Sequence, residues 1–222
     1  MSRAALQIKH QAENRQTILD AALSLFVEHG YGQVSMRNVA ARAGYSPGAI
    51  YSYFSSKDDL FYALAEEGLR LLKESDPANE PSEDPVEDIR ATVRHVYDFS
   101  KKQPQFFALI FLDRRVPRIS QDYDKMRFMG PVWAQLDARI DRCIAAGIFP
   151  ATLVPRTAWR LLIAPVLGLA SQSISKRLNR SENVDELVMQ SLEVTLAGLS
   201  AGAADLGTTQ SDVRSKKAEE EQ

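Results

Sequence analysis

Two short helical segments joined by a glycine turn, within residues 35–60, restrict the fold of this chain more than any other feature. Ser35 precedes the first segment, and its hydroxyl can cap a helix by accepting a hydrogen bond from an exposed backbone N–H. Gly44 ends that segment, because glycine readily adopts the left-handed conformation that stops a helix. Ser46 and Pro47 then begin the second segment as cap and first helical residue. The pattern predicts a helix-turn-helix motif, whose second helix can enter the major groove of DNA.

Apolar residues repeat at helical spacing around this motif. Residues 15–29 carry one apolar stripe with a period near 3.6 residues, which is typical of an amphipathic helix, and Gly30 follows as a stop. Residues 1–14 are polar, so we expect them to precede the first helix as a mobile segment. The three expected helices should share a small core, formed by Leu25, Phe26, Val34, Val39, Ala43, Ile50 and Phe54.

The sequence of the motif resembles that of a known family. From Val39 to Leu60 it reads VAARAGYSPGAIYSYFSSKDDL, and its second half contains the pattern IYxYFxSKxxL. A bare helix-turn-helix is a weak signal, whereas this pattern near the N-terminus of a chain of 222 residues is specific. The segment from about Arg15 to Leu64 resembles the DNA-binding domain of the tetracycline-repressor (TetR) family. The remaining chain agrees with that family only in length and helical character.

The resemblance implies a transcriptional regulator that binds double-stranded DNA. In this interpretation a homodimer represses transcription at a palindromic operator and leaves it when a small molecule binds. Hydroxyl and ammonium groups suit phosphate oxygens, which position a protein on DNA without reading its sequence. The residues that the resemblance places at phosphates are Ser35, Tyr51, Tyr53 and Lys57.

Base recognition should depend on few side chains. Arg37 matches a position of the family that enters the major groove, where a guanidinium can bind O6 and N7 of guanine. We therefore expect Arg37 to carry much of the base discrimination, with DNA shape adding to it. The start of the second helix is small enough to lie deep in the groove. Its predicted DNA-binding residues are Ser46, Pro47, Gly48 and Ala49.

Helical patterns also fill the rest of the chain, and no alternation of apolar and polar residues indicates a sheet. We predict an all-α fold with a three-helix DNA-binding head at residues 1–56 and a helical effector-binding and dimerisation domain at residues 57–205. Residues 57–74 should form the connecting helix, and the polar residues 206–222 a disordered tail. A Pro-rich acidic linker is expected from Ser75 to Pro85. Further helices are predicted at about 86–102, 104–114, 117–146, 155–179 and 183–202.

The last two predicted helices carry more apolar surface than one small body needs. Residues 159–174 are apolar on most sides, and small residues recur along one face, which permits close approach of another helix. We therefore expect a two-fold dimer in which the last two helices of each copy form a four-helix bundle. A monomeric bundle core is the alternative. The small residues are Ala164, Gly168, Ser171 and Ser175.

The resemblance further implies a pocket for a small molecule in the helical body. Aromatic residues are frequent there, and aromatic side chains line ligand pockets. At helical spacing, however, aromatic residues more often fill a core. We expect an apolar or amphipathic effector. The candidate pocket residues are His95, Phe99, Phe107, Phe111, Tyr123, Trp133, Trp159 and Arg160.

Charge and cysteine content limit the remaining interpretations. The formal net charge is −2, so affinity for DNA should come from a few placed cations rather than a broad basic field. Arg42 is interpreted as a solvated charge in preference to a phosphate contact. Cys143 is the only cysteine, which suits the reducing cytoplasm, and its helical context favours an inert, partly buried thiol. No secretory signal is evident, and the apolar run from Leu161 to Ala170 is too short to span a membrane.

An all-α enzyme and a helical interaction module are the opposed interpretations. The sequence contains no catalytic motif, no metal-binding pair such as HExxH, and no Gly-rich phosphate loop. Its three histidines, His10, His29 and His95, are widely separated. We therefore expect no catalytic residue, no metal and no cofactor. An interaction module would not need Tyr51, Tyr53 and Lys57 around a helix of small residues.

Overall fold

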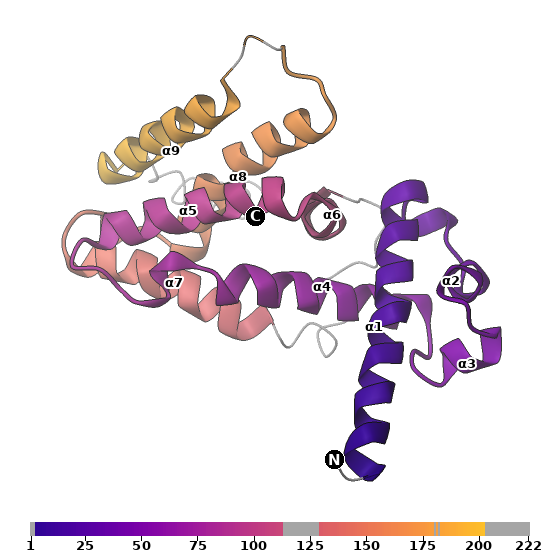
Figure 1. The fold of residues 1–222 in the computed structure, drawn as a ribbon. Helices are drawn as coiled ribbons and strands as arrows, with labels where there is room; N and C mark the ends of the chain where they lie inside the picture. The colour runs from indigo at the N-terminus through magenta and orange to yellow at the C-terminus, as the bar shows by residue number, and fades with distance from the viewer. Residues whose placement is uncertain (1–2, 113–128, 180, 182, 203–222) are drawn as a thin grey trace, which may run out of the picture. The chain divides into compact units, whose positions relative to one another are not determined.

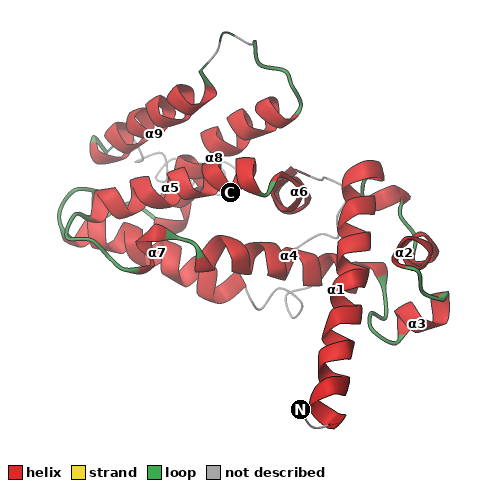
Figure 2. Ribbon diagram, viewed as in Figure 1, coloured by secondary structure: helices red, strands yellow, loops and turns green. Residues whose placement is uncertain are grey.

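The computed structural model describes residues 3–112, 129–179, 181 and 183–202. Within these residues the chain is helical and contains no strand, which confirms the predicted all-α fold (Figure 2). Tyr123 and the tail predicted at 206–222 lie outside the described residues. The α-helices are α1 (Arg3–His29), α2 (Met36–Ala43), α3 (Pro47–Tyr51), α4 (Lys57–Glu74), α5 (Pro85–Lys102), α6 (Pro104–Phe107), α7 (Met129–Ala145), α8 (Pro155–Ile174) and α9 (Val184–Ser200) (Figure 1).

The described residues form two compact units. Among the described residues, the head unit comprises 3–75, 98–112 and 129, and the body unit comprises 76–97, 130–179, 181 and 183–202. Helix α5 therefore belongs to the body unit up to residue 97 and to the head unit from residue 98. The domain boundary predicted at residue 56 stays a prediction.

The head unit is built on α1, against which α2 and α4 pack. Its core contains the aromatic residues Phe26, Tyr31 and Phe61, whose rings follow one another at centroid distances of 5.3 and 5.7 Å. The predicted core is confirmed except for Ala43, which is only half-buried because it lies at the end of α2. The other predicted residues, Leu25, Phe26, Val34, Val39, Ile50 and Phe54, are all buried.

Helix α1 begins at Arg3, so the prediction that residues 1–14 precede the first helix was wrong. Residues 4–13 contain no glycine or proline and consist largely of strong helix formers, including alanine, leucine, glutamine and lysine. The helix therefore continues towards the N-terminus although this part has no core to cover. Leu6 and Ile8 are accordingly exposed, and these turns extend beyond the rest of the head unit (Figure 1).

A glycine permits close packing between α4 and α6 in the head unit. A Cβ atom at Gly68 would lie 2.7 Å from Cδ1 of Ile110 and 2.8 Å from Cδ1 of Phe106. The helix predicted at 104–114 is instead the short α6 followed by a π-helical turn, Ala108–Leu112. Single turns of this kind occur where a helix accommodates an additional residue.

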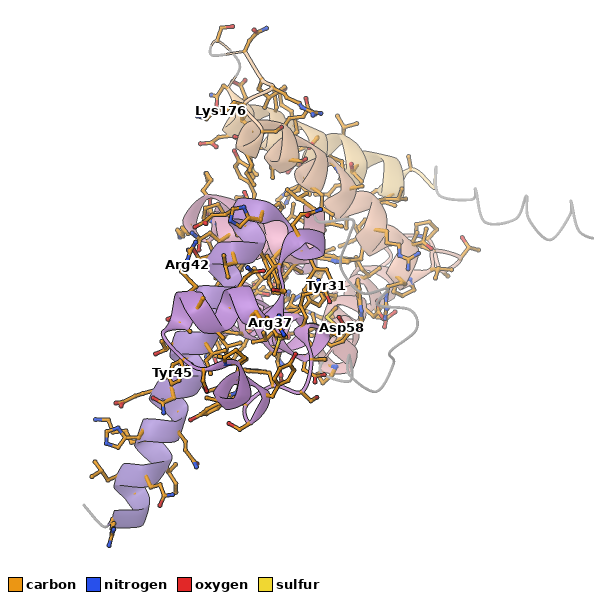
Figure 3. All side chains as sticks on the ribbon, turned by 90° about the vertical axis from the view of Figure 1, so that its right-hand side faces the viewer. Tyr31, Arg37, Arg42, Tyr45, Asp58 and Lys176 are labelled. Carbon is orange, nitrogen blue, oxygen red and sulfur yellow. The ribbon has the colours of Figure 1, made fainter. Side chains whose placement is uncertain are left out.

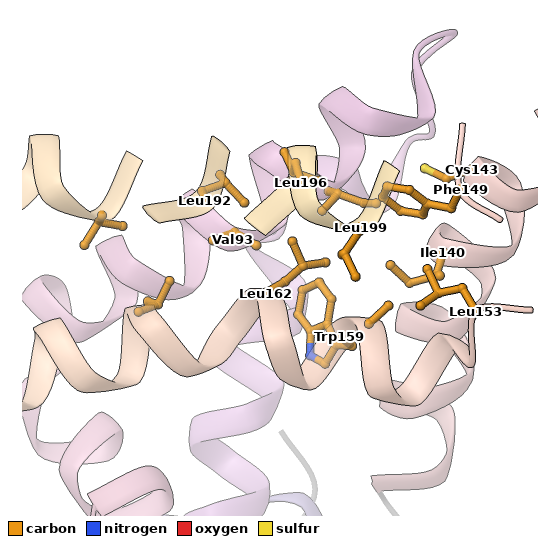
Figure 4. Packing of buried hydrophobic residues seen from close by; sticks show 14 of the residues in the cluster. Val93, Ile140, Cys143, Phe149, Leu153, Trp159, Leu162, Leu192, Leu196 and Leu199 are labelled. Carbon is orange, nitrogen blue, oxygen red and sulfur yellow. The ribbon is translucent and has the colours of Figure 1, made fainter. Parts of the chain in front are cut away.

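The body unit packs α5, α7, α8 and α9 around one apolar core (Figure 4). Trp159 and Leu162 of α8 lie opposite Leu192 and Leu196 of α9, and all four are at least 96% buried. Burial of such side chains stabilises a fold by about 1.5–3 kcal/mol each. The core also contains Val93, Ile140, Cys143, Phe149, Leu153 and Leu199.

Two arginines of α7 form hydrogen bonds with the segment from Ser75 to Pro85, which was predicted from the sequence to be a linker. Arg139 binds Asp76 and the carbonyl oxygen of Ala78, while Arg142 binds Asp88 and the carbonyl oxygen of Ser82. Residues 77–79 form a 3-10 turn within this segment. The polar stretch from residue 76 to 84 is thereby a packed part of the body unit.

Candidate DNA-binding site

Both ends of α2 are fixed by local hydrogen bonds. The hydroxyl oxygen of Ser35 accepts from the backbone N–H of Asn38 at 3.2 Å, and the Asn38 side chain accepts from the Ser35 N–H at 3.0 Å. This reciprocal pair is a capping box. At the other end Gly44 has φ = 77°, the left-handed conformation that glycine adopts without strain. Arg37, the second residue of this capped helix, is exposed on the surface.

Helix α3 offers small residues to the outside. Its cap Ser46 accepts from the N–H of Ala49 at 3.2 Å, Pro47 takes the first position, and Ile50 is fully buried. Pro47 and Gly48 are exposed, and a Cβ atom at Gly48 would meet nothing within 4 Å. The first two residues of α3 are therefore small and exposed, as the sequence predicts for the start of a helix that enters a groove, and the exposed bulky residue of this helix is Tyr51 at its end.

The two tyrosines after Ile50 have different surroundings. Tyr51 is 54% exposed. Tyr53 is half-buried, and its hydroxyl oxygen accepts a hydrogen bond of 3.2 Å from Nδ2 of Asn14 on α1. The sequence analysis did not single out Asn14, because it lies 39 residues from its partner. Among the phosphate-binding candidates, Tyr51 is therefore the accessible phenol and Tyr53 the anchored one.

The ammonium of Lys57 is held in place by Tyr31. Its Nζ donates to the carbonyl oxygen of Tyr31 at 2.9 Å and lies 4.2 Å from the centroid of the Tyr31 ring. The Tyr31 hydroxyl in turn donates to the carboxylate of Asp58. Burial raises the pKa of the Tyr31 hydroxyl above its ordinary value, and the bond to Asp58 adds to this. Lys57, the first residue of α4, is thus positioned by one aromatic residue, Tyr31.

The two arginines of α2 differ in their partners. Arg42 binds Glu28 of α1 through both terminal nitrogens, at 3.1 and 2.8 Å, and also binds Ser24. The hydrogen bond from Arg42 lowers the pKa of Glu28 to about 2, and Ser24 contributes. Arg42 is therefore a paired surface charge. Arg37 is exposed and has no ion-pair partner among the described residues, so its guanidinium is available to DNA.

All nine predicted DNA-binding residues lie in the head unit, in α2, α3 and the start of α4 or at their ends, where Ser35 and Ser46 are caps and Tyr53 lies in the turn after α3. Figure 3 labels Arg37, Arg42 and Tyr45 of this region, together with Tyr31 and Asp58. The structure adds residues that the sequence analysis missed. Asn38 had a detectable signal, because it lies three residues after Ser35 and completes the capping box. Asn14 and Tyr31 contact residues that are far away in the sequence, so no local sequence pattern indicated their contacts.

The candidate pocket residues are divided between the units. In the head unit Phe99 and Phe107 are buried, and the rings of Phe107 and Phe111 lie 5.0 Å apart. In the body unit Trp159 belongs to the core, whereas Arg160 is exposed. Their role in a pocket stays a prediction. The other two described candidates, also in the body unit, are half-buried: His95, and Trp133, whose ring lies 4.2 Å from Cζ of Arg156.

The described residues offer neither a metal site nor a membrane-spanning helix. They contain no group of three or more histidine, cysteine, aspartate or glutamate side chains that could hold a metal ion. Among the helices of this described part, none has the length and apolar content needed to cross a membrane.

Comparisons with known proteins agree with this geometry. The family model for "Bacterial regulatory proteins, tetR family" matches residues 18–64. The regulator AcrR of Shigella flexneri is 28% identical over 183 residues, which cover 74% of this chain and 80% of that protein. The structure of SmeT, the repressor of the Stenotrophomonas maltophilia multidrug efflux pump SmeDEF, is 26% identical. It aligns with a TM-score of 0.64 over 83% of this chain and 89% of SmeT.

A third similarity concerns the fold alone. The regulator FadR from Bacillus subtilis, solved in complex with stearoyl-CoA, is 18% identical and has a TM-score of 0.68. The alignment covers 82% of this chain and 98% of FadR. Together with the exposed helix-turn-helix, these matches define the chain as a helix-turn-helix transcriptional regulator rather than an enzyme. Its residues 18–64 are similar to the region that the model for bacterial regulatory proteins of the tetR family describes.

Proposed function

We propose that the chain is a dimeric repressor that binds a palindromic operator through α2, α3 and Lys57, and that a small molecule releases it. The observation that carries the DNA-binding surface is the open outer side of α3, where Pro47 and Gly48 are exposed between two capped helix ends. Such a helix can approach base edges closely. A regulator of this kind works where the DNA is, so we propose a cytoplasmic location.

Operator binding is tested with a duplex from the region upstream of the chain's own gene. The wild-type chain should bind this duplex more tightly than a random duplex of equal length, in a fluorescence anisotropy titration at fixed salt. Equal affinity for both duplexes at every salt concentration would contradict sequence-specific regulation at this locus. The two charge variants below then separate positioning from base recognition.

Lys57 should bind a phosphate, and Arg37 should read a base. Lys57→Ala should weaken operator and random DNA similarly and reduce the slope of log affinity against log salt by about one. Arg37→Ala should weaken the operator by about 1–3 kcal/mol and affect random DNA less. Arg70→Ala, which removes an exposed arginine of α4 in the same head unit, is the matched control. The assignment is wrong if Lys57→Ala changes only sequence preference.

The serines at the two caps should have a double role. The Ser35 hydroxyl already serves Asn38 within α2, and that of Ser46 serves Ala49 within α3. Ser35 also donates its hydroxyl hydrogen to Oδ1 of Asn38, so we propose that it turns this hydrogen to a phosphate when DNA binds, whereas the hydroxyl hydrogen of Ser46 has no acceptor among the described residues and can bind a phosphate directly. Ser35→Ala should therefore lower both the free energy of unfolding, by about 1 kcal/mol, and the affinity for DNA.

We propose that α8 and α9 form the dimer interface. Their outward sides carry residues that are apolar or small yet exposed in the single chain, including Leu161 at 43% and Val194 at 74%. Ala164 and Gly168 lie on the same outward side of α8, and a Cβ atom at Gly168 would meet nothing within 4 Å. A second copy can therefore approach closely, in the manner of a four-helix bundle.

Light scattering after gel filtration tests this interface. Val194→Asp should convert the dimer to a monomer, because it places a charge in a contact that excludes water. The side chain is largely exposed in one copy, so the protomer should stay folded. Val154→Asp is the matched control, since Val154 is also an exposed valine of the body unit, with 58% of its surface accessible. If Val194→Asp and Val154→Asp both keep the molar mass in solution that the wild type has, α9 is excluded from the interface.

We propose an apolar or amphipathic effector. FadR from Bacillus subtilis was solved with stearoyl-CoA, and this chain shares its fold. The candidate residues of the pocket are largely aromatic, which suits an acyl chain or a flat apolar molecule. Stearoyl-CoA and free stearate should be titrated into the operator complex in the anisotropy assay. Release by neither molecule would reject the acyl-chain class as effector.

A further inference from the structure

Asn14 of α1 binds two tyrosines at opposite ends of α3. Its Oδ1 accepts from the hydroxyl of Tyr45 at 2.8 Å, and its Nδ2 donates to the hydroxyl oxygen of Tyr53 at 3.2 Å. Tyr45 lies two residues before the start of α3, and Tyr53 lies two residues after its end. We propose that Asn14 is a positioning residue for DNA binding, which reserves the hydroxyl hydrogen of Tyr53 for a DNA phosphate. This inference rests on the phosphate contact proposed for Tyr53.

The argument depends on the single hydrogen that each phenol can donate. Tyr45 gives its hydrogen to Asn14, so only lone pairs remain on its oxygen. Tyr53 receives a hydrogen from Asn14, and no acceptor among the described residues takes its own. A phosphate oxygen in DNA only accepts hydrogen bonds. The Asn14 amide therefore makes Tyr45 a hydrogen-bond donor and Tyr53 an acceptor. Of these two phenols, only Tyr53 can donate to a phosphate without breaking its hydrogen bond to Asn14.

The same contacts also orient α3. This helix has five residues, which is too short to be stable without tertiary contacts. Its buried anchor is Ile50, and the guanidinium of Arg15, next to Asn14, lies 5.1 Å from the centroid of the Phe54 ring. Asn14 adds a hydrogen bond to each flank. Helix α1 thus holds the recognition helix before DNA binds, which lowers the entropy lost on binding.

Asn14→Asp tests the hydrogen-bond roles. A carboxylate of the same shape only accepts, so both tyrosines would turn their hydroxyl hydrogens towards it. The variant should bind the upstream duplex at least about tenfold more weakly than the wild type, because a hydrogen bond to a charged group is lost. Gln11→Glu is the control for the added negative charge, since Gln11 is an exposed residue of the same helix. Thermal unfolding followed by circular dichroism verifies that each variant is folded.

A double-mutant cycle separates positioning from charge and from misfolding. In a Tyr53→Phe background, Asn14→Asp should change affinity no more than Gln11→Glu does. In a Tyr45→Phe background, the full effect of Asn14→Asp should remain. An equal loss in both backgrounds would overturn the inference, and so would a Tyr53→Phe variant that binds as well as the wild type. In either case the wild-type titration still shows operator binding, whereas failure of the wild type to prefer the operator would instead reject the proposed function.

Discussion

The guanidinium of Arg139 joins three parts of the body unit. Its Nη1 donates to Oδ2 of Asp76 at 2.8 Å and to Oγ1 of Thr92 at 2.6 Å, and its Nη2 donates to the carbonyl oxygen of Ala78 at 2.9 Å. The side chains of Arg139 and Asp76 are only 6% and 10% exposed. Water can therefore replace little of what this arginine provides.

The cost of removing Arg139 follows from this burial. Arg139→Ala leaves the carboxylate of Asp76 without its cation, and the hydroxyl of Thr92 and the carbonyl of Ala78 lose their donor. Breaking a buried ion pair from one side costs about 3–5 kcal/mol. A domain is stable by only about 5–15 kcal/mol in total, so the variant should lose a large fraction of its stability.

Urea unfolding measures this loss. Trp133 and Trp159, both in the body unit, report by fluorescence, and every variant is compared at one protein concentration because dimerisation contributes to stability. Arg94→Ala is the control, since Arg94 and its partner Glu87 are 48% and 46% exposed. Such surface pairs contribute about 0.2–1 kcal/mol.

A second variant tests the cause of the loss. Arg139→Met combined with Asp76→Leu replaces the ion pair by apolar side chains, and it should recover part of the stability, because no unpaired charge remains although Thr92 and the carbonyl of Ala78 still lack their donor. If Arg139→Ala lowers the free energy of unfolding by no more than Arg94→Ala does, the buried pair does not have the energy assigned to it here.

Three further predictions concern single sites. Arg42 holds the pKa of Glu28 in the folded chain at about 2, below its ordinary 4.5. This pair should therefore stabilise the fold above pH 4.5 and lose its effect as the pH falls towards 2. In a carboxyl NMR titration, Arg42→Gln should return the pKa of Glu28 towards 4.5. Burial raises the pKa of the Cys143 thiol to about 11, so iodoacetamide at pH 8 should label it only after unfolding, and rapid labelling of the native protein would contradict its burial. Gly68→Ala should gain about 1 kcal/mol from the higher helix propensity of alanine. The added Cβ atom forces Ile110 and Phe106 to move, at a cost of about 1–3 kcal/mol. The free energy of unfolding in urea should therefore fall by up to about 2 kcal/mol.

The features predicted from sequence are those fixed by neighbouring residues. Ser35, Gly44 and Ser46 act within one helical turn of their own positions, so the helix-turn-helix, both ends of α2 and the start of α3 followed from local rules, whereas α3 ends at Tyr51 and not at about Phe54 as its apolar spacing predicted. The start of α1 was misplaced because polar composition was given more weight than helix propensity. The contacts of Arg139 lie 47 to 63 residues away in the chain, and those of Asn14 lie 31 and 39 residues away. A single sequence contains no signal for such pairs, and only the fold brings them together.

A head with almost no excess of positive charge can still bind DNA if its few cations and acids are arranged in advance. The first turn of α4 contains Lys57 beside Asp58 and Asp59, which would cancel its charge if all three were free. The hydroxyl of Tyr31 binds Asp58 and the hydroxyl of Ser55 binds Asp59; both carboxylates keep their charge, but neither forms an ion pair with Lys57 within the described part of the head. Lys57 has one contact to the Tyr31 carbonyl and keeps two of its three donors for a phosphate. A lysine side chain has about 2 kcal/mol of rotamer entropy to lose, and the support from Tyr31 removes part of that cost before DNA arrives. Affinity in this head therefore depends on where each charge is held, and the net charge of the chain carries little information about it.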